Sequence, residues 1–257
     1  MRRLYVSVDS VSGDPDALAV FGYPRATTRQ KKARLRELSK LGIGSVSFSG
    51  PTILGRTRVL GKGYVGVVVL GRDSGGRRLA IKARRTDSPR PHMRDEASLL
   101  GAANAAGVGP RLVSYSRNFL VMQYAGSRRI GDWLDALQGA GTSARFRRAA
   151  RSIISDCHKL DEAGIDHGEL VNISKHVIIS ERGDRPVIID FESASTARRP
   201  SNVTSITQAI FISPPLTGKV RRICRVPPKD EVIASLREYK HSRDGRSLAR
   251  LLGRLGL

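Results

Sequence analysis

The hydrophobic pattern changes character near Ala125-Gly126, and this change limits the possible folds more than any other feature of the chain. Before it, β-branched residues and glycines dominate the runs "ILGRTRVL", "YVGVVVLG" and "RLAIKA", with a turn at Asp73 to Gly76 between the last two. These runs predict three antiparallel strands. A helix over residues 91–106 and two further strands, "RLVSY" and "FLVMQY", are expected to complete this half.

The second half has the periodicity of helices. Between residues 143 and 163, apolar residues recur at steps of four and three, which is the spacing of one buried helical face. They are Phe146, Ala150, Ile153, Cys157 and Leu160. The runs "HVII" and "PVIID" predict a small hairpin, and helices are expected after Pro227-Pro228 and in "GRSLARLLGRLGL". A sheet followed by mainly helical structure predicts an α+β fold, and 257 residues are enough for one domain or two small lobes.

The first fifty residues predict a basic extension. Residues 28–41, "TRQKKARLRELSKL", place Leu35, Leu38 and Leu41 on one face with basic residues around them, which predicts a short basic helix. Residues 1–24 show little pattern. We therefore divide the chain into an extension over residues 1–50, a strand-rich part over residues 51–126 and a helical part over residues 127–257.

The formal net charge of +22 exceeds what solubility requires, and it favours a polyanionic partner whose phosphates release counterions on binding. The alternative is a proteome that is basic throughout. Residues 1–50 hold nine Lys or Arg against four acids, and residues 198–257 hold thirteen against four, so both ends are candidate docking surfaces. Few aromatic residues accompany the basic ones, which favours recognition of shape and backbone over stacking on unpaired bases.

The last predicted helix carries a basic stripe. Arg246, Arg250 and Arg254 recur every four residues opposite a row of leucines, so that the guanidinium groups face outward. The stripe predicts phosphate contact or, equally, an ordinary solvated face. The residues that would extend this surface are Arg221, Arg222, Arg225, Arg34 and Arg36.

Two cysteines, Cys157 and Cys224, are too few for a disulfide framework. No apolar run approaches the roughly 20 residues of a membrane span. The opening "LYVSV" is too short for the core of a signal peptide. We therefore expect a protein of the reducing cytoplasm.

The segment "LGKGYVGVVV" has the pattern G-x-G-x-x-G-x-V, with Gly61, Gly63 and Gly66 as its glycines. Such a loop lets backbone N–H groups approach phosphate oxygens, although a plain hairpin turn is the commoner explanation of the motif alone. Lys82 ends the third predicted strand, where an ammonium can hold the α- and β-phosphates of a nucleotide, and Glu96 is placed to pair with it. The alternatives are a solvated lysine and an ordinary exposed helix acid.

The order of the pieces resembles the protein-kinase-like fold. A glycine loop, a strand lysine, a helix glutamate, a "LVMQYAG" hinge, the His-Gly-acid loop in "DHGELVNISKHVII" and the Asp-Phe pair in "IIDFES" follow one another over roughly residues 53–195. The resemblance implies a bilobal protein that uses ATP and Mg²⁺. Its antiparallel-sheet N-lobe would cover residues 51–126, and its mainly helical C-lobe with basic C-terminal helices would cover residues 127–257.

The resemblance also implies a role for each matching residue. Met122 would stand behind the adenine ring, and the backbone of Gln123 and Ala125 would hydrogen-bond it. Glu169 would orient the acceptor hydroxyl and accept its proton, and Asp190 would ligate Mg²⁺; the alternative is that both acids cap turns. The implied residues around the phosphates are Gly61, Lys62, Gly63, Gly66, Lys82 and Glu96.

Several positions depart from the common kinase pattern. Glu169 stands where most kinases carry Asp, so its carboxylate reaches farther. Glu192 replaces the glycine of Asp-Phe-Gly, and the segment beyond it is too short for a long activation loop that phosphorylation would regulate. The second metal ligand stays open. The preference of Mg²⁺ for oxygen favours Asn172 or Ser174, whereas alignment from the following strand selects His176.

The combination of "GKGYVGVVV", "DHGEL", "KHVII", "IIDFESAS" and "NVTSITQ" is most similar to the archaeal predicted Ser/Thr kinase family, members of which act as RNA kinases on a ribose 2′-hydroxyl of tRNA. This resemblance implies ATP-dependent transfer of the γ-phosphate to tRNA, and the positive charge agrees with a tRNA partner. The alternatives are an atypical RIO-like Ser/Thr protein kinase with a protein substrate, and a pseudokinase that only binds RNA.

Overall fold

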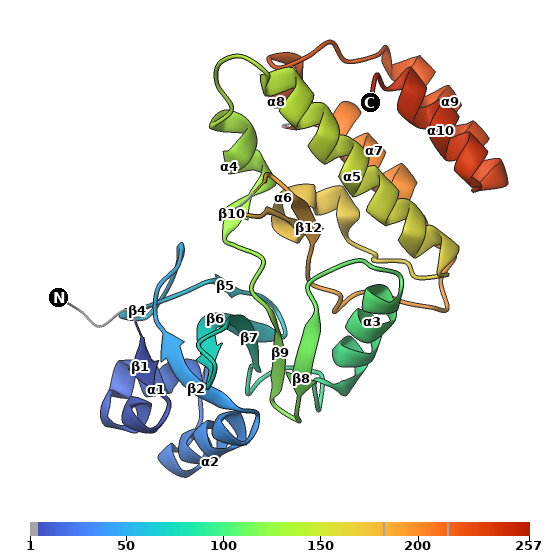
Figure 1. Ribbon diagram of the computed structural model, residues 1–257. Helices are drawn as coiled ribbons and strands as arrows, with labels where there is room; N and C mark the ends of the chain where they lie inside the picture. Colours follow the sequence, from blue (N-terminus) through green and yellow to red (C-terminus); the bar gives the residue numbers. More distant parts are fainter. Residues whose placement is uncertain (1–4, 182, 215) are drawn as a thin grey trace. The chain divides into compact units, whose positions relative to one another are not determined.

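The computed structural model describes residues 5–181, 183–214 and 216–257, and the chain divides into two compact units (Figure 1). Unit 1 comprises residues 1–101 and 110–127, and unit 2 comprises residues 102–109 and 128–257. Antiparallel strands dominate the first unit and helices dominate the second, so the chain is an α+β protein, as its hydrophobic pattern predicts.

The described part of unit 1 contains a seven-stranded antiparallel sheet in the order β1-β2-β6-β7-β9-β8, with β5 also paired to β6. Its strands are β1 (Val6–Ser7), β2 (Ile43–Ser47), β5 (Gly61–Lys62), β6 (Gly66–Asp73), β7 (Arg78–Arg84), β8 (Leu112–Tyr115) and β9 (Phe119–Gln123). One edge of β6 pairs with β7, while β2 and β5 pair with successive parts of its other edge. The turn predicted at Asp73 to Gly76 joins β6 to β7 and is confirmed.

The prediction of a single strand over residues 53–60 is wrong. These residues lie in a separate hairpin of β3 (Thr52–Leu54) and β4 (Thr57–Val59). Gly55 lies in its turn at φ 60°, a left-handed conformation that glycine adopts without strain. The sequence also does not predict β1 or β2, because one has two residues and the other, which contains Gly44, lacks an alternating pattern.

The helices in the first part of the chain are the 3-10 helix η1 (Asp9–Gly13), α1 (Pro15–Val20), α2 (Thr28–Lys40) and α3 (Arg94–Ala105). Helix α2 confirms the helix predicted over residues 28–41, and it buries Leu35 and Leu38. Thr27 and Gln30 form a capping box at its start, which satisfies two backbone donors of the first turn.

One basic residue of α2 is buried. The guanidinium of Arg34 donates to the main-chain carbonyls of Phe21 (3.0 Å) and Arg84 (2.5 Å), and to Oδ1 of Asn118 (3.0 Å). Burial, together with the nearby charge of Arg84, lowers the pKa of Arg34 to about 10. Glu37 of the same helix accepts hydrogen bonds from the Asn118 backbone and side chain. The prediction that Arg34 contacts phosphate is therefore wrong, since it fastens α2 to the sheet.

The anchoring role of Arg34 predicts a stability difference between two arginines of one helix. Arg34→Ala removes three hydrogen bonds, and the three oxygens that accept them lose this donor. We therefore expect the free energy of unfolding to fall by roughly 2–4 kcal/mol. Arg36→Ala is the matched control, because Arg36 is exposed and its loss should change stability by about 0.5 kcal/mol or less. Urea denaturation followed by circular dichroism measures both. Equal losses would contradict the anchoring role.

Unit 2 combines a small antiparallel sheet with helices. The sheet consists of β10 (Arg128–Arg129), β11 (Val177–Ile179) and β12 (Pro186–Ile188). The helices are α4 (Ile130–Asp135), α5 (Thr142–Glu162), the 3-10 helix η2 (Leu170–Asn172), α6 (Ile173–His176), α7 (Asn202–Phe211), α8 (Leu216–Arg221), α9 (Lys229–Ser242) and α10 (Gly245–Arg254). The pairing of β11 with β12 confirms the predicted hairpin.

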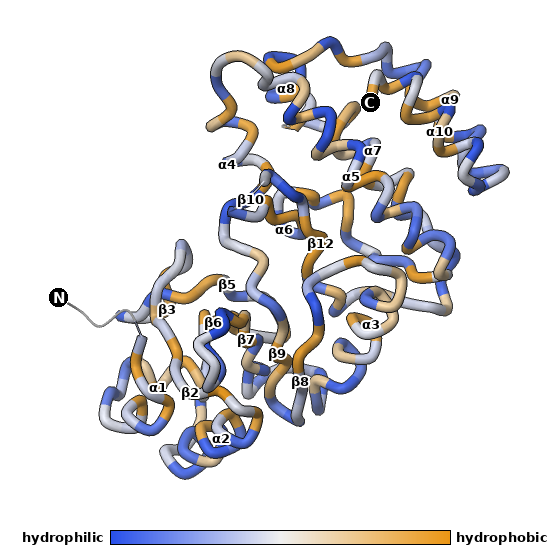
Figure 2. Tube along the Cα trace, in the orientation of Figure 1, coloured by the Kyte–Doolittle hydropathy of each residue, from blue (hydrophilic) through white to orange (hydrophobic). Residues whose placement is uncertain are grey.

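Helices α5 and α10 confirm the predicted amphipathic patterns. Every apolar residue predicted to face the core from α5 is buried, and hydrophobic and hydrophilic residues alternate along this helix in Figure 2. On α10, Arg250 and Arg254 form ion pairs with Glu238 of α9 at 2.5 and 2.8 Å. Two of the three arginines of the predicted basic stripe therefore already contact a carboxylate. Among the described helices, none combines the length and apolar character needed to cross a lipid bilayer.

Candidate functional site

Lys82 and Glu96 form a buried ion pair in unit 1. Lys82 lies on β7 and Glu96 on α3, and the Lys82 Nζ atom is 2.8 Å from Oε1 of Glu96. Their side chains are only 5% and 2% exposed. Removing two charges from water costs several kcal/mol per ion, and apolar residues of similar volume often stabilise a core as well or better. Because burying these two charges is costly, we treat the Lys82–Glu96 pair as part of a candidate functional site.

The glycine segment forms the hairpin that connects β5 to β6. Gly61 and Lys62 pair with β6, and the Gly63 N–H donates to the Gly66 carbonyl at 2.8 Å. Lys62 is exposed and donates from Nζ to the Tyr23 hydroxyl at 3.3 Å. The structure thus agrees with a simple hairpin turn, and it leaves the phosphate-binding role of the motif as a prediction.

Gly66 brings this hairpin directly against Lys82. A Cβ atom at Gly66 would lie 2.8 Å from Cγ of Lys82 and 3.0 Å from the Ala83 carbonyl oxygen, which is too close for either neighbour. At Gly61, by contrast, a Cβ atom would meet no described atom within 4 Å. The glycine at position 66 therefore makes room for the lysine, and the one at position 61 leaves open space that a ligand can enter.

This difference predicts unequal effects of the same substitution. Gly66→Ala must displace either the Lys82 side chain or the β7 backbone, so we expect it to lower the free energy of unfolding by about 1–3 kcal/mol. Gly61→Ala should stay within about 0.5 kcal/mol of the wild type. Chemical denaturation of the two variants under identical conditions measures the difference. A Gly66→Ala protein as stable as the Gly61→Ala protein would show that this close approach does not constrain the sheet.

The predicted hinge residues lie at the end of β9 and just beyond it. Met122 is half-buried and pairs in register with Ala80 of β7. The Gln123 N–H donates to the Arg111 carbonyl at 2.8 Å, so this amide hydrogen is used within unit 1. Ala125 follows the strand and is half-buried. Of the predicted contacts to adenine, the Gln123 carbonyl and the Ala125 backbone stay as candidates.

A buried polar network holds the His-Gly-Glu loop in unit 2. Oδ1 of Asn202, at the start of α7, accepts a hydrogen bond from the His167 N–H at 2.9 Å. The backbone and side chain of Asn202 donate to Oδ1 of Asp161 on α5 at 2.9 and 2.8 Å. The Tyr239 hydroxyl of α9 donates to Oδ2 of the same carboxylate at 3.2 Å. Three helices therefore fix the backbone just before Glu169.

Sequence reasoning missed this network. Asn202 and Asp161 are 41 residues apart, and no local pattern marks either one as a partner of the loop. The only sequence signal is the run "NVTSITQ", which begins at Asn202 and belongs to the family resemblance.

Two side chains orient the carboxylate of Glu169. The His176 Nε2 atom lies 3.0 Å from Oε2, and the Ser193 hydroxyl donates to Oε1 at 3.0 Å. Burial lowers the pKa of His176, although the charges of Asp190 and Glu169 oppose this, so a neutral imidazole donates its Nε2–H to the carboxylate. The Glu169 side chain is 42% exposed, which leaves it accessible to a proton donor.

The three candidates for a second metal ligand occupy different surroundings. His176 is buried and contacts Glu169, whereas Asn172 and Ser174 are exposed on the segment formed by η2 and α6. The structure therefore gives His176 a supporting role beside the predicted base, and the metal role of all three residues stays a prediction.

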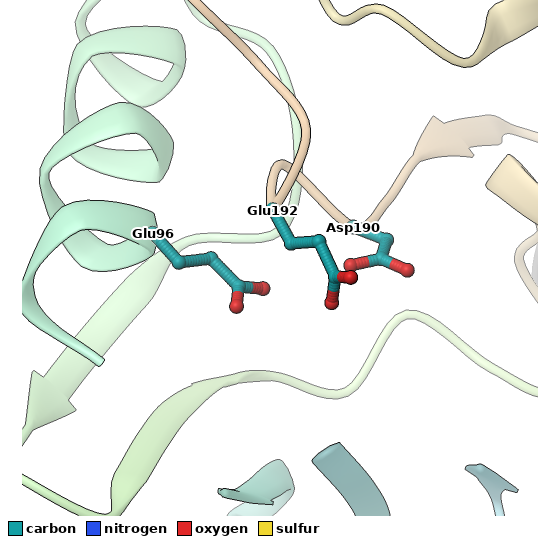
Figure 3. A group of neighbouring side chains, drawn as sticks. All are labelled: Glu96, Asp190 and Glu192. Carbon is teal, nitrogen blue, oxygen red and sulfur yellow. The ribbon is translucent and has the colours of Figure 1, made fainter. Parts of the chain in front are cut away.

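Asp190 has an unusual backbone conformation. Its φ of 69° is left-handed, and such a conformation in a residue other than glycine costs of the order of 1–3 kcal/mol and is concentrated at functional sites. Phe191, which follows it, is buried with its ring centroid 5.1 Å from that of His167. A carboxylate oxygen of Asp190 lies within 4.8 Å of one from Glu192, and Figure 3 shows these two carboxylates next to each other. Paired oxygen ligands of this kind suit Mg²⁺.

His167 is a buried neutral imidazole behind the loop. Its Nε2 atom lies 3.1 Å from the Ile189 carbonyl oxygen, and because a carbonyl only accepts, Nε2 carries the proton. Burial lowers the pKa of His167 to about 4, even though the hydrogen bond to Ile189 opposes the shift. This ring therefore packs between the predicted catalytic loop and the segment that carries Asp190 without adding a charge.

The lowered pKa of His167 predicts a loss of stability in acid. The pKa of His167 is about 4 in the folded chain and 6.5, the ordinary value, in the unfolded chain. Between pH 6.5 and pH 4, therefore, the His167 imidazole takes up a proton in the unfolded chain but not in the folded chain. The contribution to stability is complete above pH 6.5 and is lost as the pH falls to 4, by up to roughly 3 kcal/mol. Urea denaturation at several pH values should show a shallower loss for His167→Gln than for the wild type. His241→Gln, at an exposed position on α9, should keep the wild-type dependence, and identical curves for all three proteins would contradict the assignment.

In comparisons with known proteins, no family model matches the chain, and no curated protein matches it significantly in sequence. The candidate site is therefore defined by its own geometry. Unit 1 brings together the glycine hairpin, Lys82 and Glu96, and unit 2 brings together Glu169 and His176, with Asp190 beside Glu192.

Proposed function

We propose that the chain is an ATP-dependent kinase with a bilobal, protein-kinase-like fold, and that its acceptor is a ribose 2′-hydroxyl of tRNA. The observation that carries the proposal is the buried Lys82–Glu96 pair against Gly66, because an ammonium of fixed position beside an open glycine hairpin suits the phosphates of a nucleotide. The resemblance of the sequence to the archaeal RNA kinases supplies the choice of acceptor. The proposed setting is the cytoplasm.

In this proposal unit 1 binds the nucleotide. Lys82 holds the α- and β-phosphates, and Glu96 fixes the ammonium by its 2.8 Å contact. The backbone of the glycine hairpin covers the phosphates, and Met122 with the backbone of Gln123 and Ala125 surrounds the adenine ring. The residues of the hairpin that take part are Gly61, Lys62, Gly63 and Gly66.

Unit 2 supplies the groups that act on the acceptor. Glu169, oriented by His176 and Ser193, accepts the proton of the 2′-hydroxyl as the oxygen attacks the γ-phosphorus, and ADP leaves. Asp190 is the proposed ligand of Mg²⁺, which supplies positive charge against the phosphate oxygens when it is bound. Neutral His176 suits this arrangement, since it holds the carboxylate without neutralising it.

The positive charge supports an RNA acceptor over a protein acceptor. A net charge of +22 provides many more cations than one nucleotide requires, and a folded tRNA offers a broad phosphate surface. The same charge also fits a RIO-like protein kinase that associates with ribosomes, so the acceptor itself has to be identified by experiment.

Transfer of labelled γ-phosphate from ATP to total tRNA tests the proposal, with the modified nucleotide mapped by mass spectrometry. We expect Lys82→Ala and Asp190→Ala to abolish transfer while tRNA binding persists. Glu169→Gln should lower kcat by about 10²-fold or more, because the amide cannot accept the proton. Glu231→Gln, at an exposed position on α9, is the matched control and should retain full activity.

Each alternative has its own outcome in the same assay. Label on protein instead of tRNA would support the RIO-like protein kinase, and tight tRNA binding without any transfer would support the pseudokinase. Full turnover in both Lys82→Ala and Asp190→Ala would contradict kinase chemistry at these residues altogether.

A further inference from the structure

We infer that a surface of unit 1 around Tyr23 binds single-stranded nucleotides of an RNA partner, an inference that rests on the proposed function for the identity of that partner. The surface, which we name the Tyr23 cluster, consists of Tyr23, Arg25, Lys31, Lys62, Tyr64 and Arg85. These residues are distributed over four segments of unit 1, so no stretch of the sequence reveals them together.

Two cationic side chains contact the ring of Tyr23. Nζ of Lys62 lies 5.3 Å from the ring centroid and Cζ of Arg85 lies 5.2 Å from it, both within the range of cation–π attraction. Two like charges held close to one ring repel each other, and the Asp87 carboxylate, which is hydrogen-bonded to the Arg85 guanidinium, offsets only one of them. A phosphodiester group that contacts both would relieve this repulsion, so the arrangement suits a nucleic-acid backbone.

A hollow of about 520 Å³ extends this surface toward the start of α2. It is lined by Gly22, Tyr23, Arg25, Thr27, Gln30 and Lys31. A Cβ atom at Gly22 would lie 2.6 Å from Cγ of Lys31, so the lysine stem packs against that glycine. The hollow therefore has one cation at Arg25 and another at Lys31, in addition to the pair at Tyr23.

The charges of the cluster are strongly unequal. Arg25, Lys31, Lys62 and Arg85 contribute four positive charges. Asp87 contributes one negative charge, through two hydrogen bonds from the Arg85 guanidinium at 2.8 and 2.7 Å. The named residues thus keep a clear positive excess after this ion pair is formed.

The cluster is held in place by backbone contacts. The Thr86 N–H donates to the Tyr23 carbonyl at 2.8 Å, and the Thr86 hydroxyl donates to the Arg25 carbonyl at 2.8 Å. The Arg85 guanidinium also donates to the Gly63 carbonyl of the glycine hairpin at 3.2 Å. These bonds hold the backbone at Tyr23 and Arg25 and the guanidinium of Arg85, so a ligand that contacts these groups meets a partly preformed surface.

Tyr64 distinguishes a nucleic acid from an acidic protein as the partner. It lies between Gly63 and Gly66 in the turn of the hairpin, and 72% of its surface is exposed. An exposed aromatic ring beside a cationic surface is the combination with which proteins bind single-stranded nucleic acids, since bases stack on the ring while cations contact the backbone. The unpaired loops of tRNA offer such nucleotides. The expectation of little stacking, which rests on the small number of aromatic residues in the whole chain, therefore does not extend to this surface.

Fluorescence anisotropy with a labelled tRNA transcript, measured without ATP across a range of salt concentrations, tests the inference. For the double variant Arg25→Ala with Lys31→Ala, we expect weaker binding and a salt-dependence slope smaller by about 1.4, since each cation on a single strand contributes roughly 0.7. For Tyr64→Ala, we expect roughly 5- to 100-fold weaker binding with an unchanged slope, because only stacking is lost. Arg148→Ala, at an exposed position on α5 outside both basic ends of the chain, is the control and should bind as the wild type does.

The outcomes separate this inference from the proposed function. Variants that unfold at the wild-type temperature but bind tRNA with wild-type affinity and slope would overturn the inference. Competition by polyglutamate as effective as that by unlabelled tRNA, together with no effect of Tyr64→Ala, would overturn it in favour of an acidic protein partner. Binding is measured without ATP, so a protein that binds tRNA through the Tyr23 cluster but transfers no phosphate would support this inference and contradict the proposed function. Variants that transfer phosphate and bind tRNA as the wild type does would support the proposed function and contradict this inference.

Discussion

The ion pair between the buried Lys82 ammonium and the Glu96 carboxylate is the interaction that explains the arrangement of strand β7, helix α3 and Gly66 in unit 1. The two atoms are 2.8 Å apart with almost no solvent exposure, although each ion loses several kcal/mol of hydration on burial. The lysine lies on a strand with neighbours on both edges, the glutamate comes from the following helix, and Gly66 leaves the room that the lysine stem requires. Apolar residues of similar volume often hold such elements together equally well. This cost is the reason why we propose a nucleotide ligand for the pair.

Unit 2 positions acidic groups by a different means. Buried neutral imidazoles support the predicted base and the segment that carries Asp190: His176 contacts Glu169, and His167 donates to Ile189. Neutral donors orient a carboxylate or a backbone without cancelling its charge. The left-handed conformation of Asp190 adds strain that the surrounding packing has to offset.

Periodic elements could be predicted from the sequence, and long-range polar contacts could not. The apolar stripe of α5 and the strand patterns of β6 and β7 follow local rules, and the structure confirms them. The hairpin of β3 and β4 was hidden because β-branched residues on both sides of a two-residue turn look like one strand. The burial of Arg34 could not be foreseen, since its partners lie up to 84 residues away and an arginine on a helix is ordinarily solvated.

In the candidate site, too, the residues could be predicted from the sequence, whereas most of their long-range contacts could not. Motif spacing identified Lys82 and Glu96, which the structure joins, and it identified Glu169 and His176, which the structure also joins. The spacing did not indicate that His176 contacts Glu169, nor that Asn202 and Asp161 hold the loop, because these contacts depend on how helices of unit 2 pack. The place of Tyr23 in the Tyr23 cluster likewise could not be predicted, because Lys62 and Arg85 reach its ring from other segments only in the folded chain.

Affinity labelling with an acyl phosphate of ATP shows whether Lys82 lies beside the phosphates of a bound nucleotide, because the reagent transfers its acyl group to a lysine amine next to them. Mass spectrometry of the digested protein then identifies the labelled lysine. We expect Lys82 to be labelled, excess ATP with Mg²⁺ to protect it, and Asp190→Asn to weaken the protection by Mg²⁺. Labelling spread over exposed lysines, with Lys82 unmodified and ATP without effect, would contradict this expectation.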